Sequence, residues 1–414
     1  MSGTEYFIWL SELCGAGSPL AKKVYNTFDG NIYKAYGSTL EEFLDMGFDR
    51  EEAELLSDKN FERSNMIIDY CAENMVGILT YDSEYYPSRL FDTDSPPPVL
   101  YYKGRIEKLT ERAYITAVGS RKCSQDAYDA GYAVCYKLAA AGISVVTGLA
   151  DGIDTACITG ALDAGGFTVG VLGSGINILY PFDNSSLFSR VFKSGLVITE
   201  FSPFTEPLAV NFPIRNRIMA ALGNAVLVVE ARRNSGALIT ADHAKMMGRK
   251  IYVIPGMLTN PLCQGSNALI KEGATPVVDS YDIINDMEFS YPTEVSVTSK
   301  APQRKLSKKD SYLSRRMRRK ARFAEKNRAD DVSPHISEQL SQEQENEISC
   351  EQKDLSILND KEKAVFLALC EEASSADTIG IKTSLSQDDV LSALTMLEIY
   401  GLATSLPGGM YETL

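Results

Sequence analysis

The chain has 414 residues, of which 44% are hydrophobic and 23% are charged, and its 55 Asp and Glu outnumber its 41 Lys and Arg. This apolar content can fill packed cores, which excludes a wholly disordered chain, and the length predicts roughly two to four domains. No apolar run reaches about 18 residues. Met1 to Leu20 has no basic start, so we expect neither a membrane span nor a signal peptide.

Eight cysteines are spread along the chain without a CxxC pair, and the two histidines are His243 and His335. These counts argue against a disulfide framework, a zinc ribbon and a Ser-His-Asp triad. We therefore expect no metal, no other cofactor, and reduced thiols in a cytoplasmic protein.

The net charge of −14 is unevenly distributed, which matters for any polyanionic ligand. Residues 1–112 hold 11 basic and 20 acidic side chains, residues 113–284 hold 13 of each, and residues 300–328 hold 13 basic and 2 acidic. The neutral middle can contain a local basic groove, and repulsion from the acidic ends would confine an anion to it.

Residues 1–84 have the pattern of short amphipathic helices and predict a small helical domain of the SAM or helix-hairpin-helix kind. The turn Gly15-Ala16-Gly17 could hold a phosphate through its amides, but the acidic surroundings favour a protein-interaction module. Residues 85–112 contain the run Pro96-Pro97-Pro98 and predict a proline-rich connector.

From 113 to 289, short apolar runs alternate with longer helical patterns. The predicted strands are 113–119, 143–147, 167–172, 195–200, 225–230 and 250–254. The predicted helices are 125–141, 153–164, 184–193, 214–222, 237–247 and 265–272. Strands this apolar are buried on both faces, so the pattern predicts an α/β fold with a doubly wound, mostly parallel sheet.

Residues 290–354 lose this periodicity and predict a disordered linker, basic over 300–328 and then acidic. The basic half either binds nucleic-acid phosphate or serves as a solvated tether. Residues 355–414 predict a winged helix, with helices at 360–371, 375–380 and 386–400 and a wing at 402–412. The third helix contains Asp388, Asp389 and Glu398 but no Lys or Arg, which favours a protein contact over DNA reading.

Glycine-rich loops follow the predicted strands, at the carboxyl edge where open parallel sheets bind ligands. Glycine lets the backbone approach an anion, and the free amides of a helix start point towards it. We predict an extended phosphate-binding edge made of Gly119, Ser120, Arg121, Gly148, Gly152, Gly173, Gly175, Asn211, Phe212, Arg215, Asn216, Arg217, Ser235 and Gly236.

Arginines and aromatic residues are the side chains of this edge with the clearest chemistry. Arg121, Arg215 and Arg217 are expected to neutralise phosphates, and Asn211 and Asn216 to position the ligand through their amides. The nearby aromatic residues either stack on unpaired bases or pack as core and lid residues. They are Phe212, Tyr180 and Phe182.

Three carboxylates, Asp154, Glu200 and Glu230, lie at strand ends. A catalytic pair among them is conceivable. We favour a structural role, orienting arginines or bonding loop amides, because no nucleophile or water-activating partner is visible. The chain also lacks a dinucleotide fingerprint and a P-loop, so neither NAD binding nor ATP hydrolysis is supported.

Seven motifs occur in a fixed order along the chain. They are 119–121 (GSR), 147–154 (TGLADGID), 180–181 (YP), 212–217 (FPIRNR), 235–240 (SGALIT), 255–256 (PG) and 269–274 (LIKEGA). Together they resemble the bacterial DNA-processing protein A (DprA/Smf) family. The resemblance implies a Rossmann-like domain that binds single-stranded DNA through Arg121 and the glycine loops, flanked by helical and winged-helix domains. It also implies a homodimer that helps to load RecA during natural transformation.

Three positions depart from the family pattern. Cys157 stands where a His is usual, Thr199 stands where a Ser usually precedes the strand-end Glu, and residues 182–186 lack the Lys found in many members. The basic segment 300–328 is also outside the pattern.

The favoured function is therefore a sequence-tolerant binder of single-stranded DNA that protects incoming DNA and mediates recombination without turnover. A nucleotide-processing hydrolase of the same sheet class is an alternative, although its Pro-Gly-Gly-x-Gly-Thr stretch is missing here. A pure interaction scaffold is a second alternative, favoured by the acidic end domains.

Overall fold

The computed structural model divides into two compact units, 1–317 and 318–414. It describes residues 3–109, 113–290 and 295, and most of 360–413. Within that last stretch it omits 372–373, 384, 388, 391–392, 395–396, 398–402 and 407–409. The predicted linker over 290–354 lies, except for its residues 290 and 295, outside the described residues.

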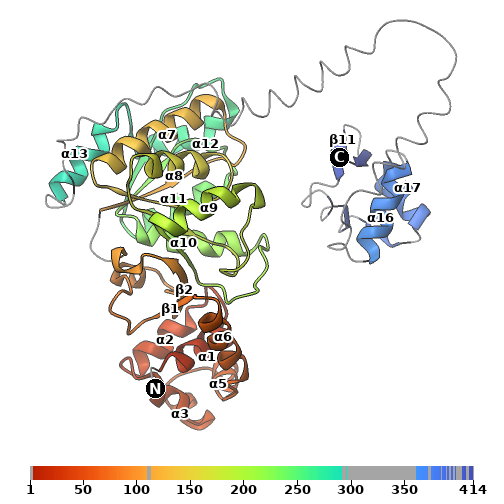
Figure 1. The fold of residues 1–414 in the computed structure, drawn as a ribbon. Coiled ribbons are helices and arrows are strands. Elements are labelled where there is room, and N and C mark those ends of the chain that lie inside the picture. The colour runs from red at the N-terminus through yellow and green to blue at the C-terminus, as the bar shows by residue number, and fades with distance from the viewer. Residues whose placement is uncertain are drawn as a thin grey trace, which may run out of the picture. The chain divides into compact units, whose positions relative to one another are not determined.

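Six helices form the N-terminal part of the first unit, at the lower end of Figure 1. They are α1 (Thr4–Cys14), α2 (Leu20–Thr27), α3 (Ile32–Gly37), α4 (Leu40–Asp45), α5 (Arg50–Leu56) and α6 (Glu62–Glu73). Capping boxes begin α4 and α5, where Thr39 pairs with Glu42 and Asp49 with Glu52. Trp9 on α1 is buried among them, so this part has an apolar core.

The described residues form a nine-stranded sheet in the order β1-β2-β6-β5-β4-β3-β7-β8-β9. The strands are β1 (Gly77–Thr80), β2 (Val99–Gly104), β3 (Tyr114–Val118), β4 (Ser144–Thr147), β5 (Thr168–Val171), β6 (Leu196–Thr199), β7 (Ala225–Val228), β8 (Lys250–Val253) and β9 (Thr275–Pro276). Neighbours from β6 to β9 are parallel, which confirms the predicted doubly wound α/β sheet. The order reverses between β3 and β7.

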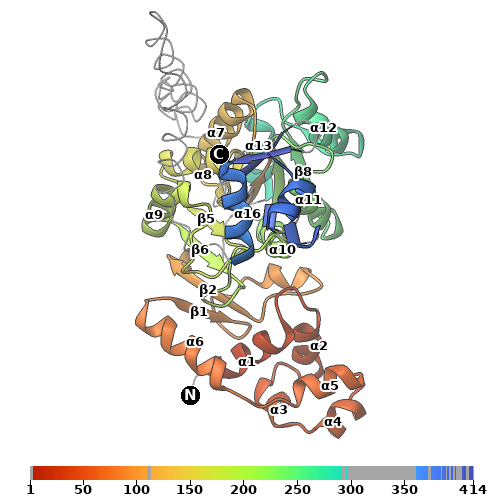
Figure 2. The same ribbon diagram turned by 90° about the vertical axis from the view of Figure 1, so that its right-hand side faces the viewer.

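Helices cover both faces of this sheet (Figure 1 and Figure 2). They are α7 (Gln125–Ala140), α8 (Ile153–Asp163), α9 (Ser185–Ser194), α10 (Asn211–Leu222), α11 (Gly236–Met246), α12 (Gln264–Lys271) and α13 (Tyr281–Ser290). Alternate residues of β3 enter different cores: Ile115 and Ala117 pack with α7 and α13, whereas Tyr114 and Val118 belong to the cluster that includes α9, α10 and α11.

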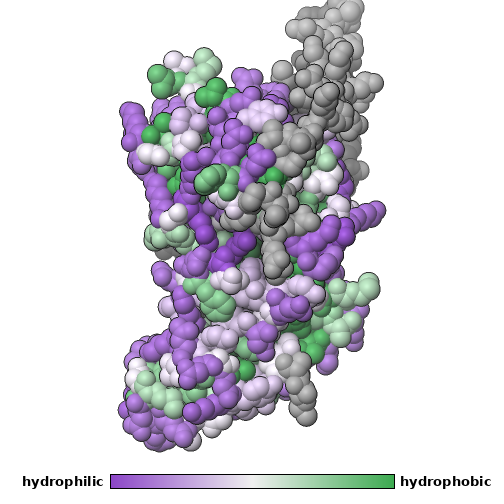
Figure 3. All heavy atoms as spheres, turned by 90° about the vertical axis from the view of Figure 1, so that its left-hand side faces the viewer, coloured by the Kyte–Doolittle hydropathy of each residue, from purple (hydrophilic) through white to green (hydrophobic). Residues whose placement is uncertain are grey.

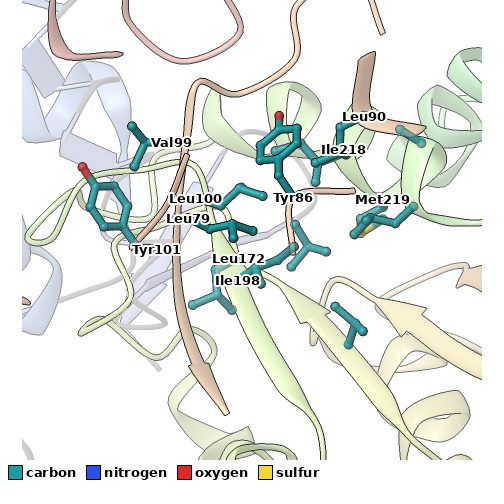
Figure 4. Close-up of a cluster of buried hydrophobic side chains, with 14 of the residues drawn as sticks. Leu79, Tyr86, Leu90, Val99, Leu100, Tyr101, Leu172, Ile198, Ile218 and Met219 are labelled. Carbon is teal, nitrogen blue, oxygen red and sulfur yellow. The ribbon is translucent and has the colours of Figure 1, made fainter. Parts of the chain in front are cut away.

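The sheet includes two strands, β1 and β2, that precede the domain boundary expected at residue 113. β1 lies in the segment predicted as helical and β2 in the predicted connector, and both are antiparallel to their neighbours. Leu90, between the two strands, and Leu100, on β2, belong to the same buried cluster as Ile198 on β6 and Ile218 on α10 (Figure 4). The N-terminal part and the sheet therefore share one hydrophobic core.

The second unit contains α16 (Asp360–Glu371), α17 (Ala376–Thr383) and a small sheet of β10 (Ser374–Ser375), β12 (Met410–Thr413) and β11 (Ala403–Leu406). Phe366, Ile379 and Leu397 are buried in its core. The predicted third helix over 386–400 lies partly outside the described residues.

No helix of the described residues is long and apolar enough to cross a membrane. On the face drawn in Figure 3, hydrophobic side chains occur in small groups among hydrophilic ones.

Candidate nucleic-acid interface

Loops after β3, β4, β5 and β6 meet at the carboxyl edge of the parallel strands. The backbone joins the first two loops, because the Ile153 amide donates to the Ser120 carbonyl oxygen at 3.2 Å. The fold thus brings together the predicted residues 119–121, 148–152, 173–175 and 211–217. We call this edge the strand-end rim.

A pocket opens in the strand-end rim, lined by Arg121, Gly148, Ala150, Asp151, Tyr180, Pro181 and Phe212. Arg121 is exposed, and its guanidinium carbon lies 4.8 Å from the centre of the Phe212 ring. The Tyr180 and Phe212 rings are 5.8 Å apart between centroids. An exposed cation beside two half-buried aromatic rings can take both the phosphate and the base of a nucleotide.

Glycines in the rim make room for side chains of α10. A Cβ on Gly148 would overlap the Arg215 guanidinium, and one on Gly173 would lie 2.9 Å from the Phe212 ring. Close approach, rather than an unusual backbone angle, therefore requires glycine at both places.

Several backbone amides of the rim, which we expected to hold a phosphate, donate to oxygen atoms of the protein instead. The Ser120 amide donates to the Glu230 carbonyl oxygen at 2.8 Å, the Gly148 amide to Asp154 at 2.9 Å, and the Gly175 amide to Thr205 at 2.8 Å. Each of these donors is satisfied inside the protein, so phosphate contacts must come from other groups.

Arg215 also differs from the prediction, because its guanidinium is buried rather than presented to solvent. It donates to the carbonyl oxygens of Gly148, at 3.0 Å, and of Val171. Burial lowers the pKa of Arg215 to about 10, and the nearby Asp154 carboxylate opposes this shift. Arg215 therefore joins the ends of β4 and β5 from below the pocket.

Arg217 requires the same correction. Its guanidinium is buried and donates to Glu200 at 2.6 Å and to the Ser95 carbonyl oxygen at 2.9 Å. Asn211 and Asn216 on the same helix are buried as well, and their side-chain amides donate to the Glu206 and Gly236 carbonyl oxygens.

The three strand-end carboxylates hold loops and arginines. Asp154 accepts from the Gly148 and Ala150 amides, and Glu230 accepts from the Ser124 amide and hydroxyl. Burial raises the pKa of Asp154 to about 6, against the opposing effect of Arg215.

Glu200 holds the N-terminal part as well as Arg217. Its Oε1 accepts from the Gly17 amide at 3.1 Å. The turn considered for phosphate binding therefore directs this amide into the protein.

Ser235 and Gly236 lie outside the pocket, at the start of α11, where the Ser235 hydroxyl caps the helix. Phe182 is 78% exposed and is absent from the pocket lining.

Sequence reasoning missed three cations at this edge. Lys122 follows β3, and Arg232 and Arg233 follow β7; all three are exposed. Their position just after predicted strands was the signal that could have identified them. The described residues contain no group of His, Cys, Asp and Glu placed to hold a metal.

Comparisons with known proteins identify the family. The sequence profile of DNA recombination-mediator protein A matches residues 77–288, and that of the DprA winged helix domain matches 351–409. Protein Smf of Synechocystis is 28% identical over 421 residues, which covers 100% of both chains.

DprA of Streptococcus pneumoniae is similar both in sequence and in structure. This DNA processing protein is 38% identical over 204 residues, covering 49% of this chain and 72% of that protein. The X-ray structure of DprA from the same organism covers 69% of this chain and 99% of its own, with 32% identity and a TM-score of 0.59. The chain described here therefore belongs to the DNA recombination-mediator protein A (DprA/Smf) family.

Proposed function

We propose that this chain binds single-stranded DNA at the strand-end rim and mediates recombination without chemical turnover. The bound strand would be protected while a recombinase is loaded. RecA as that recombinase, a homodimer as the active form, and a role in natural transformation in the cytoplasm belong to the same proposal, and they are supported by the family resemblance.

The arrangement of Arg121 against Phe212 carries this proposal. Among the described residues that line the pocket, Arg121 is the one Lys or Arg, and it is exposed. Arg215 lies outside the lining and is buried. A phosphate can pair with this guanidinium while an unpaired base lies against Phe212 or Tyr180. Each base–aromatic stack contributes about 1–3 kcal/mol. A blunt duplex offers no unstacked base, so it should bind weakly.

The first prediction concerns Arg121→Ala, which removes the phosphate partner and the contact to Phe212. We expect affinity for a fluorescent oligothymidylate to fall on the order of tenfold or more at low salt. The slope of log affinity against log salt should fall by about 0.7. Fluorescence anisotropy during a salt titration measures both quantities.

The matched control is Arg105→Ala. Arg105 is also an exposed arginine, but its amide donates to the carbonyl oxygen of Gly195, just before β6, at the opposite edge of the sheet. Its loss should leave affinity and salt slope unchanged. Equal affinity of wild type and Arg121→Ala would contradict the proposed pocket, and tight binding to blunt duplex would contradict the preference for unpaired DNA.

A further inference from the structure

Exposed cations continue the strand-end rim past the pocket, across the point where the strand order reverses. Lys122 lies in the loop after β3, and Arg232 and Arg233 lie in the loop after β7. β3 and β7 are neighbours in the sheet. Their loops are joined where the Ser120 amide donates to the Glu230 carbonyl oxygen at 2.8 Å.

The loop after β7 is held rigidly although its arginine side chains are exposed. The Gly265 amide donates to the Ala231 carbonyl oxygen at 2.8 Å, and a Cβ on Gly265 would overlap the Arg232 carbonyl. The Ser235 side chain caps the following helix. A fixed backbone lowers the entropy lost when the two arginines bind a ligand.

Charge differs between the two sides of Arg121. On the pocket side lie Asp151 and Asp183; burial and the neighbouring Asp183 carboxylate raise the pKa of Asp151. Residues 182–186 on that side contain no Lys or Arg.

On the β7 side, residues 230–236 contain one acid, Glu230, and its buried carboxylate is used by Ser124. Within the described part of the chain, Lys122, Arg232 and Arg233 form no ion pair. These cations are therefore available to phosphates without breaking an internal contact.

We propose that a DNA strand held at Arg121 continues over the β3 and β7 loops, where Lys122, Arg232 and Arg233 contact its phosphates. This path leads away from Asp151 and Asp183. It rests on the proposed function and adds to it the direction of the strand and a second cluster of contacts. Because the added contacts are to phosphate, they should be tolerant of sequence.

The test measures how tightly two full-length proteins, wild type and the double variant Arg232→Gln/Arg233→Gln, bind two oligothymidylates. One oligothymidylate has about 4 nucleotides and the other about 16. The short one can occupy the Arg121 pocket, whereas the long one also reaches the β7 loop. We expect the double variant to bind the long strand on the order of tenfold more weakly, with a salt slope smaller by about 1.4. Binding of the short strand should stay within twofold of wild type.

The matched control is Lys137→Gln/Lys250→Gln, which removes the same charge at other places. Lys137 is in the last turn of α7 and Lys250 begins β8, so both lie at the opposite edge of the sheet. If this control weakens long-strand binding as much as Arg232→Gln/Arg233→Gln does, the effect is one of net charge and the proposed path is wrong.

The remaining outcomes separate this inference from the proposed function. Loss of binding in Arg121→Ala together with unchanged long-strand affinity in Arg232→Gln/Arg233→Gln would overturn the path alone. Failure of wild type to bind either strand would overturn both. Equal losses on the short and long strands would place the β7 arginines in the pocket and overturn the path as drawn. Circular dichroism of the double variant shows whether it is folded.

Discussion

At the scale of single residues, three arginines predicted to do the same work have different surroundings. Arg121 is exposed beside an aromatic ring, whereas Arg215 and Arg217 are buried on carbonyl oxygens and a carboxylate. A buried guanidinium whose donors are all used is unavailable to a phosphate. If it turned towards the phosphate, it would leave the buried oxygen atoms that accept from it without hydrogen-bond partners. The role of each arginine therefore follows from its neighbours.

Asp154 allows a test of this buried layer through pH. Its pKa is raised from 3.8 to about 6, so folding favours the protonated form. The protonated Asp154 carboxyl therefore contributes its full share of the free energy of unfolding below about pH 4, and this contribution is lost as the pH rises through about 6. The difference corresponds to about 3 kcal/mol.

Asp154→Asn should remove this loss. Its side-chain oxygen can still accept from the Gly148 and Ala150 amides, which both use one oxygen of Asp154. We expect the free energy of unfolding of the variant, relative to wild type, to rise between pH 4 and pH 7. Urea unfolding at several pH values measures this; the other titrating groups cancel because both proteins contain them. A difference that stays flat or falls over this range would contradict the shift.

At the scale of elements, α10 joins the pocket to the rest of the first unit. Phe212 in its first turn lines the pocket, Arg215 one turn later holds the ends of β4 and β5, and Arg217 binds Glu200 and the connector at Ser95. The pocket geometry therefore depends on how this helix is anchored.

The Arg217–Glu200 pair can be tested by a double-mutant cycle. Arg217→Met leaves a buried carboxylate whose Oε2 already has no hydrogen-bond partner, and Glu200→Leu leaves a buried guanidinium. Each single change should lower the free energy of unfolding by about 3–5 kcal/mol. The double variant should lose clearly less than the sum, because neither charge then remains uncompensated.

Guanidinium-induced unfolding of the four proteins gives the coupling energy. Arg105→Ala at the exposed Arg105–Glu107 pair is the control, with an expected effect of about 0–1 kcal/mol. Additive losses at Arg217 and Glu200 would show that the pair does not act as a unit.

The central strands and helices were predictable because a doubly buried parallel strand requires a continuous apolar run. β3 to β8 lie within one or two residues of the predicted ranges at each end. β1 and β2 were missed because Gly77–Thr80 is short and follows a helix, and because the prolines before β2 resemble a connector. β2 pairs with β6, from Tyr101↔Thr199 to Gly104↔Leu196, and pairing between segments this far apart in sequence leaves no local sequence signal.

The candidate site was predictable to the level of its loops. Parallel strands end at one edge, so 119–121, 148–152, 173–175 and 211–217 had to approach one another. The partners of Arg215 could not be predicted, since they are the carbonyl oxygens of Gly148 and Val171, at the ends of two strands far away in sequence. For the same reason, the sequence does not distinguish a glycine that lets a ligand approach the backbone from one that makes room for another side chain. Gly148 is of the second kind, because it makes room for the Arg215 guanidinium.

At the scale of the whole molecule, a chain with a net charge of −14 can bind a polyanion only through a small part of its surface. The sheet region 113–284 is balanced, with 13 basic and 13 acidic residues, and residues 1–112 carry an acidic excess. Affinity should therefore depend steeply on the few exposed cations of the strand-end rim and on the strongly basic segment 300–328.

The last prediction separates these two sources by comparing chains that end at Ser290 and at Arg328. Both contain the nine-stranded sheet, and the shorter chain lacks one buried core residue, Val295. Both should therefore retain binding that Arg121→Ala weakens. The longer chain should bind more tightly and with a steeper salt slope, by about 0.7 for each added phosphate contact. A variant of the longer chain with four arginines changed to Gln keeps its length but loses charge; the positions are Arg315, Arg316, Arg318 and Arg319. If charge is the cause, this variant should behave like the shorter chain in anisotropy titrations. Equal salt slopes for all three proteins would mean that the basic segment acts as a tether and that the rim alone binds DNA.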